Sequence, residues 1–283
     1  MLISVTSLSA YEYCKRKLYL ERVLNLWEPA KEPTILGSIR HHVLDQVNKQ
    51  EQQLVKSIQE HHSEEEIVEK YSTAFLRLLK KALVDHKEDL DKVGVNQLDT
   101  YRKIKDLVLQ ESEIRAQNLI NFIKTHKIFG DELWEKLTPK IESECRVESE
   151  KLGLKGIIDH IEYYEDIIIP GEMKTGSAPR DGVWEGHKIQ LGAYILMLSE
   201  KIGKNIKRGY VRYLDIAENR DIVMNPFLKL KIIELVRKVN ECLASKELPE
   251  FCDSANKCKS CGIREQCYNQ KFLEELMVKA NLA

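Results

Sequence analysis

The 283-residue sequence has no long hydrophobic run, no secretory leader and almost no net charge. Its longest apolar segments, such as Gly192 to Leu198, are far too short to span a bilayer, so we expect no contact with a membrane. Residues 1–10 contain no basic region and lead directly into a charged helix, which is not the pattern of a signal peptide. These absences predict a cytoplasmic protein.

The 44 basic and 45 acidic residues give a formal net charge of -1, which does not indicate a nucleic-acid-binding protein. Basic residues do cluster locally, in Lys15-Arg16-Lys17, between Lys201 and Arg212, and from Lys229 to Lys238. Each cluster is equally typical of a solvated helix surface. With 43% hydrophobic and 31% charged residues, the composition is that of a soluble globular protein of one large domain or two modest ones.

The seven cysteines form an odd set, which argues against a disulfide framework in a chain without a secretory signal. Three of them, Cys258, Cys261 and Cys267, follow the spacing C-x₂-C-x₅-C, which is typical of metal ligands. These three lack a fourth ligand nearby. Cys14, at the other end of the chain, is either that ligand or a small buried side chain on a helix.

Helical periodicity fills the region from Asp45 to about Asp131, and it predicts a helical subdomain inserted ahead of the sheet. No residue in this region indicates chemistry, and Asp85-His86-Lys87 is interpreted as part of a solvated helix face. The predicted division is residues 1–44 for the N-terminal helices, 45–135 for the insertion, 136–247 for an α/β core and 248–283 for the cysteine-rich tail.

Alternating apolar residues predict three antiparallel strands in a meander, the last two of which flank the polar turn Tyr164-Glu165-Asp166. A helix from Trp184 to Lys201 and strands from Arg208 to Ile216 and Arg220 to Met224 follow. Asn225-Pro226 then begins another helix, with an N-cap residue and a proline in the first turn. The order of elements predicts an α/β fold with a mixed sheet.

Two carboxylates and a lysine converge in the predicted meander. Asp159 and Glu172 fall side by side on adjacent strands, and Lys174 lies on the same face as Glu172 because side chains alternate along a strand. Carboxylates bind Mg²⁺ or Mn²⁺, which can activate water against a phosphodiester, and a nearby ammonium group can orient that water. This is the pattern of the PD-(D/E)xK nuclease core. The alternative is a surface hairpin with ordinary charges.

Three further residues are candidates for the same site. His41 lies one helical turn after Gly37 and is either an additional metal ligand or part of an exposed helix surface; His42 would then face away. Gln190 and Tyr194 are neighbours on one helix face, where both can hydrogen-bond a phosphate, a base or the lysine. On their own, they are equally typical of an amphipathic surface.

Several motifs, in this order, resemble the RecB-like nucleases of CRISPR systems, the fourth Cas protein family. The resemblance covers nearly all of the chain outside the helical insertion. The motifs are Tyr13-Cys14 with Lys15-Arg16-Lys17, Gly37-x₃-His41, Gly156-x₂-Asp159, Pro170-x-Glu172-Met173-Lys174-x-Gly176, Gln190-Leu191-x₂-Tyr194, and Leu248-Pro249 before the last cysteines.

The resemblance implies two cofactors. The Mn²⁺ or Mg²⁺ would be held by His41, Asp159, Glu172 and the backbone carbonyl of Met173, with Lys174 positioning the water. Gln190 and Tyr194 would support the site and contact DNA. A 4Fe-4S cluster would be ligated by four cysteines that join the N-terminal helix to the C-terminal tail, with Cys252 as a spare: Cys14, Cys258, Cys261 and Cys267. Four thiolates also suit Zn²⁺, and the ligand type alone does not separate the two metals.

The preferred hypothesis is a metal-dependent deoxyribonuclease that trims single-stranded DNA or DNA with single-stranded ends. It would act as an exonuclease, with endonuclease activity as a further option, during acquisition of CRISPR spacers beside the integrase. Two alternatives stay open. One is a stand-alone RecB-like nuclease of repair or recombination. The other is a non-catalytic iron-sulfur adaptor that binds DNA.

Overall fold

One mixed sheet of six strands organises the computed structural model, which describes residues 2–282. The strands are β1 (Ile3–Ser4), β2 (Lys140–Ser149), β3 (Leu154–Tyr163), β4 (Ile168–Lys174), β5 (Arg208–Tyr213) and β6 (Glu218–Val223). Strand β3 pairs antiparallel with β2 along one edge, and with β4 (antiparallel) and the short β1 (parallel) along the other. Strand β5 then pairs parallel with β4, and β6 antiparallel with β5. The predicted mixed sheet and the antiparallel meander of β2, β3 and β4 are confirmed.

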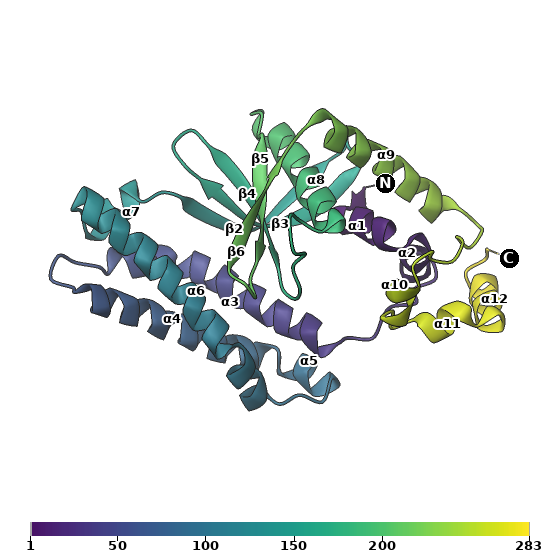
Figure 1. Cartoon of the computed structure of the whole chain (residues 1–283), viewed down its shortest axis with the longest axis horizontal. Helices are drawn as coiled ribbons and strands as arrows, with labels where there is room; N and C mark the ends of the chain where they lie inside the picture. The colour runs from purple at the N-terminus through teal and green to yellow at the C-terminus, as the bar shows by residue number, and fades with distance from the viewer. Residues whose placement is uncertain (1, 283) are drawn as a thin grey trace.

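Helices cover both faces of this sheet (Figure 1). On one side lie α3 (Glu32–Lys56), α4 (Glu64–Asp85), α5 (Lys87–Lys92), α6 (Gln97–His126) and α7 (Gly130–Lys136). On the other side lie α1 (Val5–Tyr13), α8 (Glu185–Ile202) and α9 (Pro226–Ala244), and the remaining helices are α2 (Lys15–Arg22), α10 (Ala255–Lys259), α11 (Arg264–Tyr268) and α12 (Gln270–Lys279). Each side has its own hydrophobic core, so the sheet is buried from both faces.

Side-chain caps begin several of these helices where the sequence signals them. At α4, Ser63 and Glu66 form a reciprocal capping box, and at α9 the Asn225 side chain accepts a hydrogen bond from the Leu228 N–H beside Pro226. Such caps each contribute about 1 kcal/mol to stability. The apolar stripe of α9, which includes Leu228 and Ile232, then packs against α8.

Helix α3 runs without a break from Glu32 to Lys56 and lies between the sheet and the other helices on its side. The division proposed from the sequence, at residues 44 and 45, therefore falls inside a continuous helix. It contacts β2 of the sheet as well as the helices α4, α6 and α7. Within residues 2–282, none of the helices combines the length and the apolar character required to cross a membrane.

The two ends of the chain pack together beside the sheet (Figure 1). Tyr19 and Leu20 of α2 lie in a small core with Ile263 and with Leu273 of α12. The Tyr19 hydroxyl donates a hydrogen bond to the Ser245 carbonyl over 2.9 Å, which fixes α2 against the end of α9. This packing brings the N-terminal and C-terminal cysteines into one region.

Candidate active site

Asp159 and Glu172 lie on the neighbouring strands β3 and β4, next to the paired residues His160 and Gly171. Asp159 Oδ2 accepts a hydrogen bond from the backbone N–H of Met173 over 2.6 Å. That bond fixes the Asp159 carboxylate against β4. The structure therefore brings the two carboxylates to the positions expected from the sequence.

Lys174, Glu172 and Gln190 form a closed hydrogen-bonded triangle. Lys174 Nζ donates to Glu172 Oε1 over 2.7 Å and to Gln190 Oε1 over 2.9 Å. Gln190 Nε2, on helix α8, donates to the same Glu172 oxygen over 2.6 Å. The triangle fixes the lysine ammonium in place. The other oxygen, Glu172 Oε2, is buried and has no hydrogen-bond partner.

Tyr194 lies one turn beyond Gln190 on α8 and is only 2% exposed. Its ring packs on β3 at Gly156, where a Cβ atom would come within 2.7 Å of the Tyr194 ring. Gly156 is therefore required for this close approach. The buried position of Tyr194 supports the strand that carries Asp159, and it departs from the DNA contact expected from the resemblance.

His41 reaches the same place from helix α3, with its Nδ1 atom 3.6 Å from Asp159 Oδ1. One turn earlier, Gly37 lies so close to Thr175 that a Cβ atom would come within 2.7 Å of the threonine hydroxyl. Asp215 pairs with Arg40 of α3 and accepts a hydrogen bond of 2.6 Å from the Gly176 N–H. These contacts fix α3 against the segment that follows β4.

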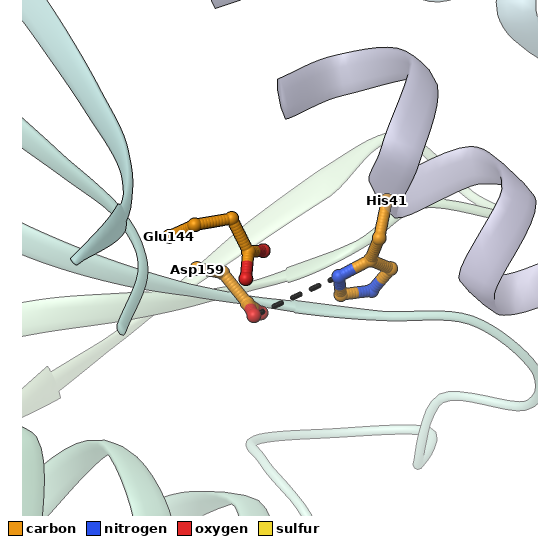
Figure 2. A group of neighbouring side chains, drawn as sticks. All are labelled: His41, Glu144 and Asp159. Carbon is orange, nitrogen blue, oxygen red and sulfur yellow. Dashed lines mark ion pairs between the residues drawn. The ribbon is translucent and has the colours of Figure 1, made fainter. Parts of the chain in front are cut away.

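Glu144 of β2 completes a group that the sequence does not reveal. Its carboxylate, the His41 ring and the Asp159 carboxylate each offer a donor atom within 4.8 Å of the others. Figure 2 shows the His41 ring directed at Asp159, with the Glu144 carboxylate beside it. Glu144 has a positive φ of 53° and is absent from the otherwise regular register of β2 with β3. This local distortion occurs opposite Asp159.

These side chains open into a cleft of about 770 Å³ between α3 and the sheet. Lys174 and Met173 line its floor, together with Asp159 and Glu144. His42 lines the cleft as well as His41, so the expectation that His42 faces away is not met. The cleft gives a substrate direct access to the carboxylates.

The pKa values in the site reflect burial and close pairing. Burial, together with the charge of Asp159, raises the pKa of Glu172 to about 8. Burial also opposes ionisation of Asp159, but the hydrogen bond and the charge of His41 outweigh it and lower the pKa of Asp159. Burial acts to lower the pKa of His41, and Asp159 more than offsets it, so that this pKa is raised. These shifts favour a protonated Glu172 and an ion pair between His41 and Asp159.

The donor atoms fit a hard divalent metal ion. Two carboxylates and an imidazole suit Mn²⁺, and oxygen ligands suit Mg²⁺. A cation near Glu172 Oε2 would give this buried oxygen the partner that it lacks and would offset the burial that raises the pKa of Glu172. The residues present are therefore compatible with the metal ion expected from the sequence.

Five cysteines gather at the ends of the chain around one small cavity, which includes all four predicted ligands. Its cysteines are Cys14, Cys252, Cys258, Cys261 and Cys267. Cys14 caps helix α2, where its Sγ accepts a hydrogen bond from the Lys17 N–H over 3.3 Å. Arg16 and Lys257 also line this cavity. Positive charge of this kind favours thiolates and an anionic cluster.

A comparison with protein families agrees with this geometry. Residues 2–268 match the family model of the PD-(D/E)XK nuclease superfamily. The chain belongs to this superfamily. Asp159, Glu172 and Lys174, on β3 and β4, lie within the matched residues.

Three relatives extend the comparison. A CRISPR-associated exonuclease Cas4/endonuclease Cas1 fusion of Leptospira interrogans is 31% identical over 49% of this chain and 27% of its own length. A CRISPR-associated exonuclease Cas4 of Rhodospirillum rubrum is 26% identical over 42% of this chain and 36% of its own length. The DNA replication ATP-dependent helicase/nuclease JHS1 of Arabidopsis thaliana is 25% identical over 94% of this chain and 20% of its own length.

The resemblance to the CRISPR-associated nucleases that the motifs predict is confirmed by these relatives. The chain spans only about a fifth to a third of the length of the relatives that it matches.

Proposed function

We propose that the protein is a metal-dependent deoxyribonuclease that hydrolyses phosphodiesters at single-stranded DNA ends. The observation that carries this proposal is the triangle of Lys174, Glu172 and Gln190, whose lysine lines an open cleft together with Asp159 and His41. A structural ion pair has no need of a cleft of this size or of an unpartnered buried carboxylate oxygen.

Each side chain of the centre has its own role in the proposed reaction. Asp159, Glu172, His41 and Glu144, with the Met173 carbonyl, would hold Mn²⁺ or Mg²⁺. The bound ion would polarise the phosphoryl oxygen and lower the pKa of a water ligand. The Lys174 ammonium orients the attacking water and offsets charge on the phosphate, and Gln190 keeps that ammonium directed at the cleft. Tyr194 acts through packing under β3.

The cysteines would hold a 4Fe-4S cluster with Cys14, Cys258, Cys261 and Cys267 as ligands. The grouping of these cysteines around one cavity and the basic side chains that line it support a cluster at this place. Cys252 lies beside Cys14 and is a substitute ligand. The cluster would join α2 to the C-terminal tail.

The pathway is proposed from the relatives. Similarity to the Cas4/Cas1 fusion supports a part in CRISPR spacer acquisition, with an integrase as the partner. Similarity to the helicase/nuclease JHS1 over 94% of this chain favours a second candidate, a nuclease of replication or repair. The non-catalytic adaptor is the weakest of the three, because the lysine and both carboxylates are present and connected.

Cleavage of end-labelled single-stranded DNA tests the proposal, with anaerobically purified protein in Mn²⁺, Mg²⁺ or EDTA. We expect cleavage that requires the metal and that falls at least about a hundredfold in Lys174→Ala. Lys188→Ala, an exposed lysine on α8 that pairs with Glu185, is the matched control and should cleave like the parent. Equal cleavage by Lys174→Ala would refute the catalytic assignment, and binding without cleavage by the parent would favour the adaptor.

A further inference from the structure

A second pair of histidines faces the cleft outside the carboxylate centre. His42 follows His41 on α3, and His86 lies at the junction of α4 and α5 in the helical layer. Both side chains line the cleft, and they are 26% and 21% exposed. Their rings meet edge to face, with His42 Nδ1 only 3.3 Å from His86 Nε2.

The outer nitrogen of each ring faces a carboxylate. His42 Nε2 lies 3.9 Å from Asp85 Oδ2, and His86 Nδ1 lies 3.5 Å from Asp89 Oδ2. In one pair of tautomers, one inner nitrogen donates a hydrogen bond to the other over 3.3 Å. When the proton of each ring is on its outer nitrogen, facing the carboxylate, both inner nitrogens carry lone pairs that a cation between them would bind.

The spacing of the inner nitrogens matches a bound metal. Metal–nitrogen bonds of about 2.0–2.1 Å at a tetrahedral angle place two imidazole nitrogens about 3.3 Å apart. The carboxylates behind the two rings are the outer partners that metal-bound histidines usually have. Two imidazoles suit a borderline-soft ion such as Zn²⁺ better than Mg²⁺.

We propose that His42 and His86 form a second metal site, which takes a divalent transition-metal ion of the Zn²⁺ class. The site connects α3 to the α4–α5 junction and thereby braces the helical layer next to the helix that carries His41. Two protein ligands leave the remaining coordination positions open to the cleft, where water or an anionic oxygen of a bound molecule completes the shell. The site does not rest on the proposed nuclease activity.

Zinc binding measured by equilibrium dialysis tests the site, with Zn²⁺ as the only probe. Both proteins carry Asp159→Asn, which weakens zinc binding at the carboxylate centre. The single variant Asp159→Asn is compared with the double variant Asp159→Asn/His86→Gln. We expect one fewer zinc per chain in the double variant. Zinc bound to cysteines contributes equally to both proteins and cancels in the difference.

A matched control and a second variant keep the test independent of folding. His61→Gln is the matched control. It removes one ring of another histidine pair, in which the exposed His61 stacks on His62 with ring centroids 4.3 Å apart. It should leave zinc binding unchanged. Asp89→Asn keeps both histidines, removes the charge of the carboxylate behind His86 and of its exposed pair with Lys92, and should weaken zinc binding about 10- to 100-fold.

The unfolding temperature gives an independent measurement. Zinc should raise it more in Asp159→Asn than in Asp159→Asn/His86→Gln, and Asp159→Asn/His61→Gln should respond like Asp159→Asn. Equal zinc stoichiometry with and without His86, or an equal rise in unfolding temperature, would overturn the proposal and leave a hydrogen-bonded histidine pair.

Discussion

The carboxylate centre and the cysteine site differ in what holds their side chains in place. Glu172 and Gln190 are 3% and 6% exposed, and each bonds to another member of the centre. Cys258 and Cys267 lie instead on α10 and α11, which are helices of five residues without a buried side chain. Helices this short are unstable on their own. The first site is therefore formed by the fold, whereas the proposed cluster at the second would connect short helices that have little stability of their own.

This contrast has an energetic consequence. At the carboxylate centre, the proposed metal would bind donors that the fold already presents, so its removal should leave the sheet intact. At the cysteine site, part of the free energy of binding the proposed cluster would stabilise the tail. Substitutions at the two sites should accordingly separate catalysis from stability.

The largest expected effect comes from Asp159→Asn. The amide lacks the negative charge of the carboxylate, which faces His41 and accepts a hydrogen bond from the Met173 N–H. DNA cleavage should therefore fall about a hundredfold or more, while the iron content stays at the parental level. Single-turnover cleavage and iron analysis measure both quantities. Asp166→Asn, in the exposed turn after β3, is the control. Cleavage within a few fold of the parent would mean that Asp159 is not a ligand.

Cys258→Ser should give the opposite pattern. We expect loss of bound iron and of the visible absorption of the cluster, faster proteolysis of the C-terminal tail, and a cleavage rate within about tenfold of the parent. Cys242→Ser, in α9 and outside the cysteine cavity, should keep its iron. Full retention of iron in Cys258→Ser would remove this cysteine from the ligand set, and Cys252 would be the next to test.

Glu144→Gln should have an intermediate effect on the carboxylate centre. The substitution keeps the shape of the side chain and removes one of three donors that lie within 4.8 Å, so the affinity for Mn²⁺ should fall about 10- to 100-fold. Titration calorimetry measures this affinity directly. The control is Glu142→Gln, two residues earlier on β2, where the side chain bonds Tyr163 instead. Unchanged affinity would show that Glu144 is only a neighbour.

The smallest effect is a pH dependence of stability in metal-free protein. Because burial raises the pKa of Glu172 to about 8 from 4.5, the folded state binds more protons than the unfolded state between these pH values. The free energy of unfolding should therefore fall as pH rises through that window, by up to about 1.4 kcal/mol per pH unit. Urea unfolding of the parent and of Glu172→Gln measures this. Parallel pH profiles would mean that Glu172 stays ionised in the folded state.

Local pattern explains why Asp159, Glu172 and Lys174 are predictable from sequence. The two strands are joined by a short turn, so their pairing follows from alternation along the chain. Gln190 and Lys174 meet because α8 packs on β4 and β5, a contact that the order of elements favours. The mixed sheet follows from the same local signals.

Local sequence patterns do not predict the position of Glu144 or the contact of His42 with His86. The position of Glu144 depends on the register of β2 and on a positive φ that its residue type does not signal. His42 meets His86 because α3 and the end of α4 pack together across a separation of 44 residues. Periodicity places each histidine on a helix, but it does not specify which helices are neighbours.

The most direct test compares Lys174→Ala and Cys258→Ser in one experiment, with cleavage of end-labelled single-stranded DNA in Mn²⁺ and iron content measured on the same samples. We predict that Lys174→Ala keeps its iron and does not cleave, whereas Cys258→Ser loses its iron and still cleaves. Parental cleavage by the lysine variant would contradict the assignment of the sheet site as the catalytic centre.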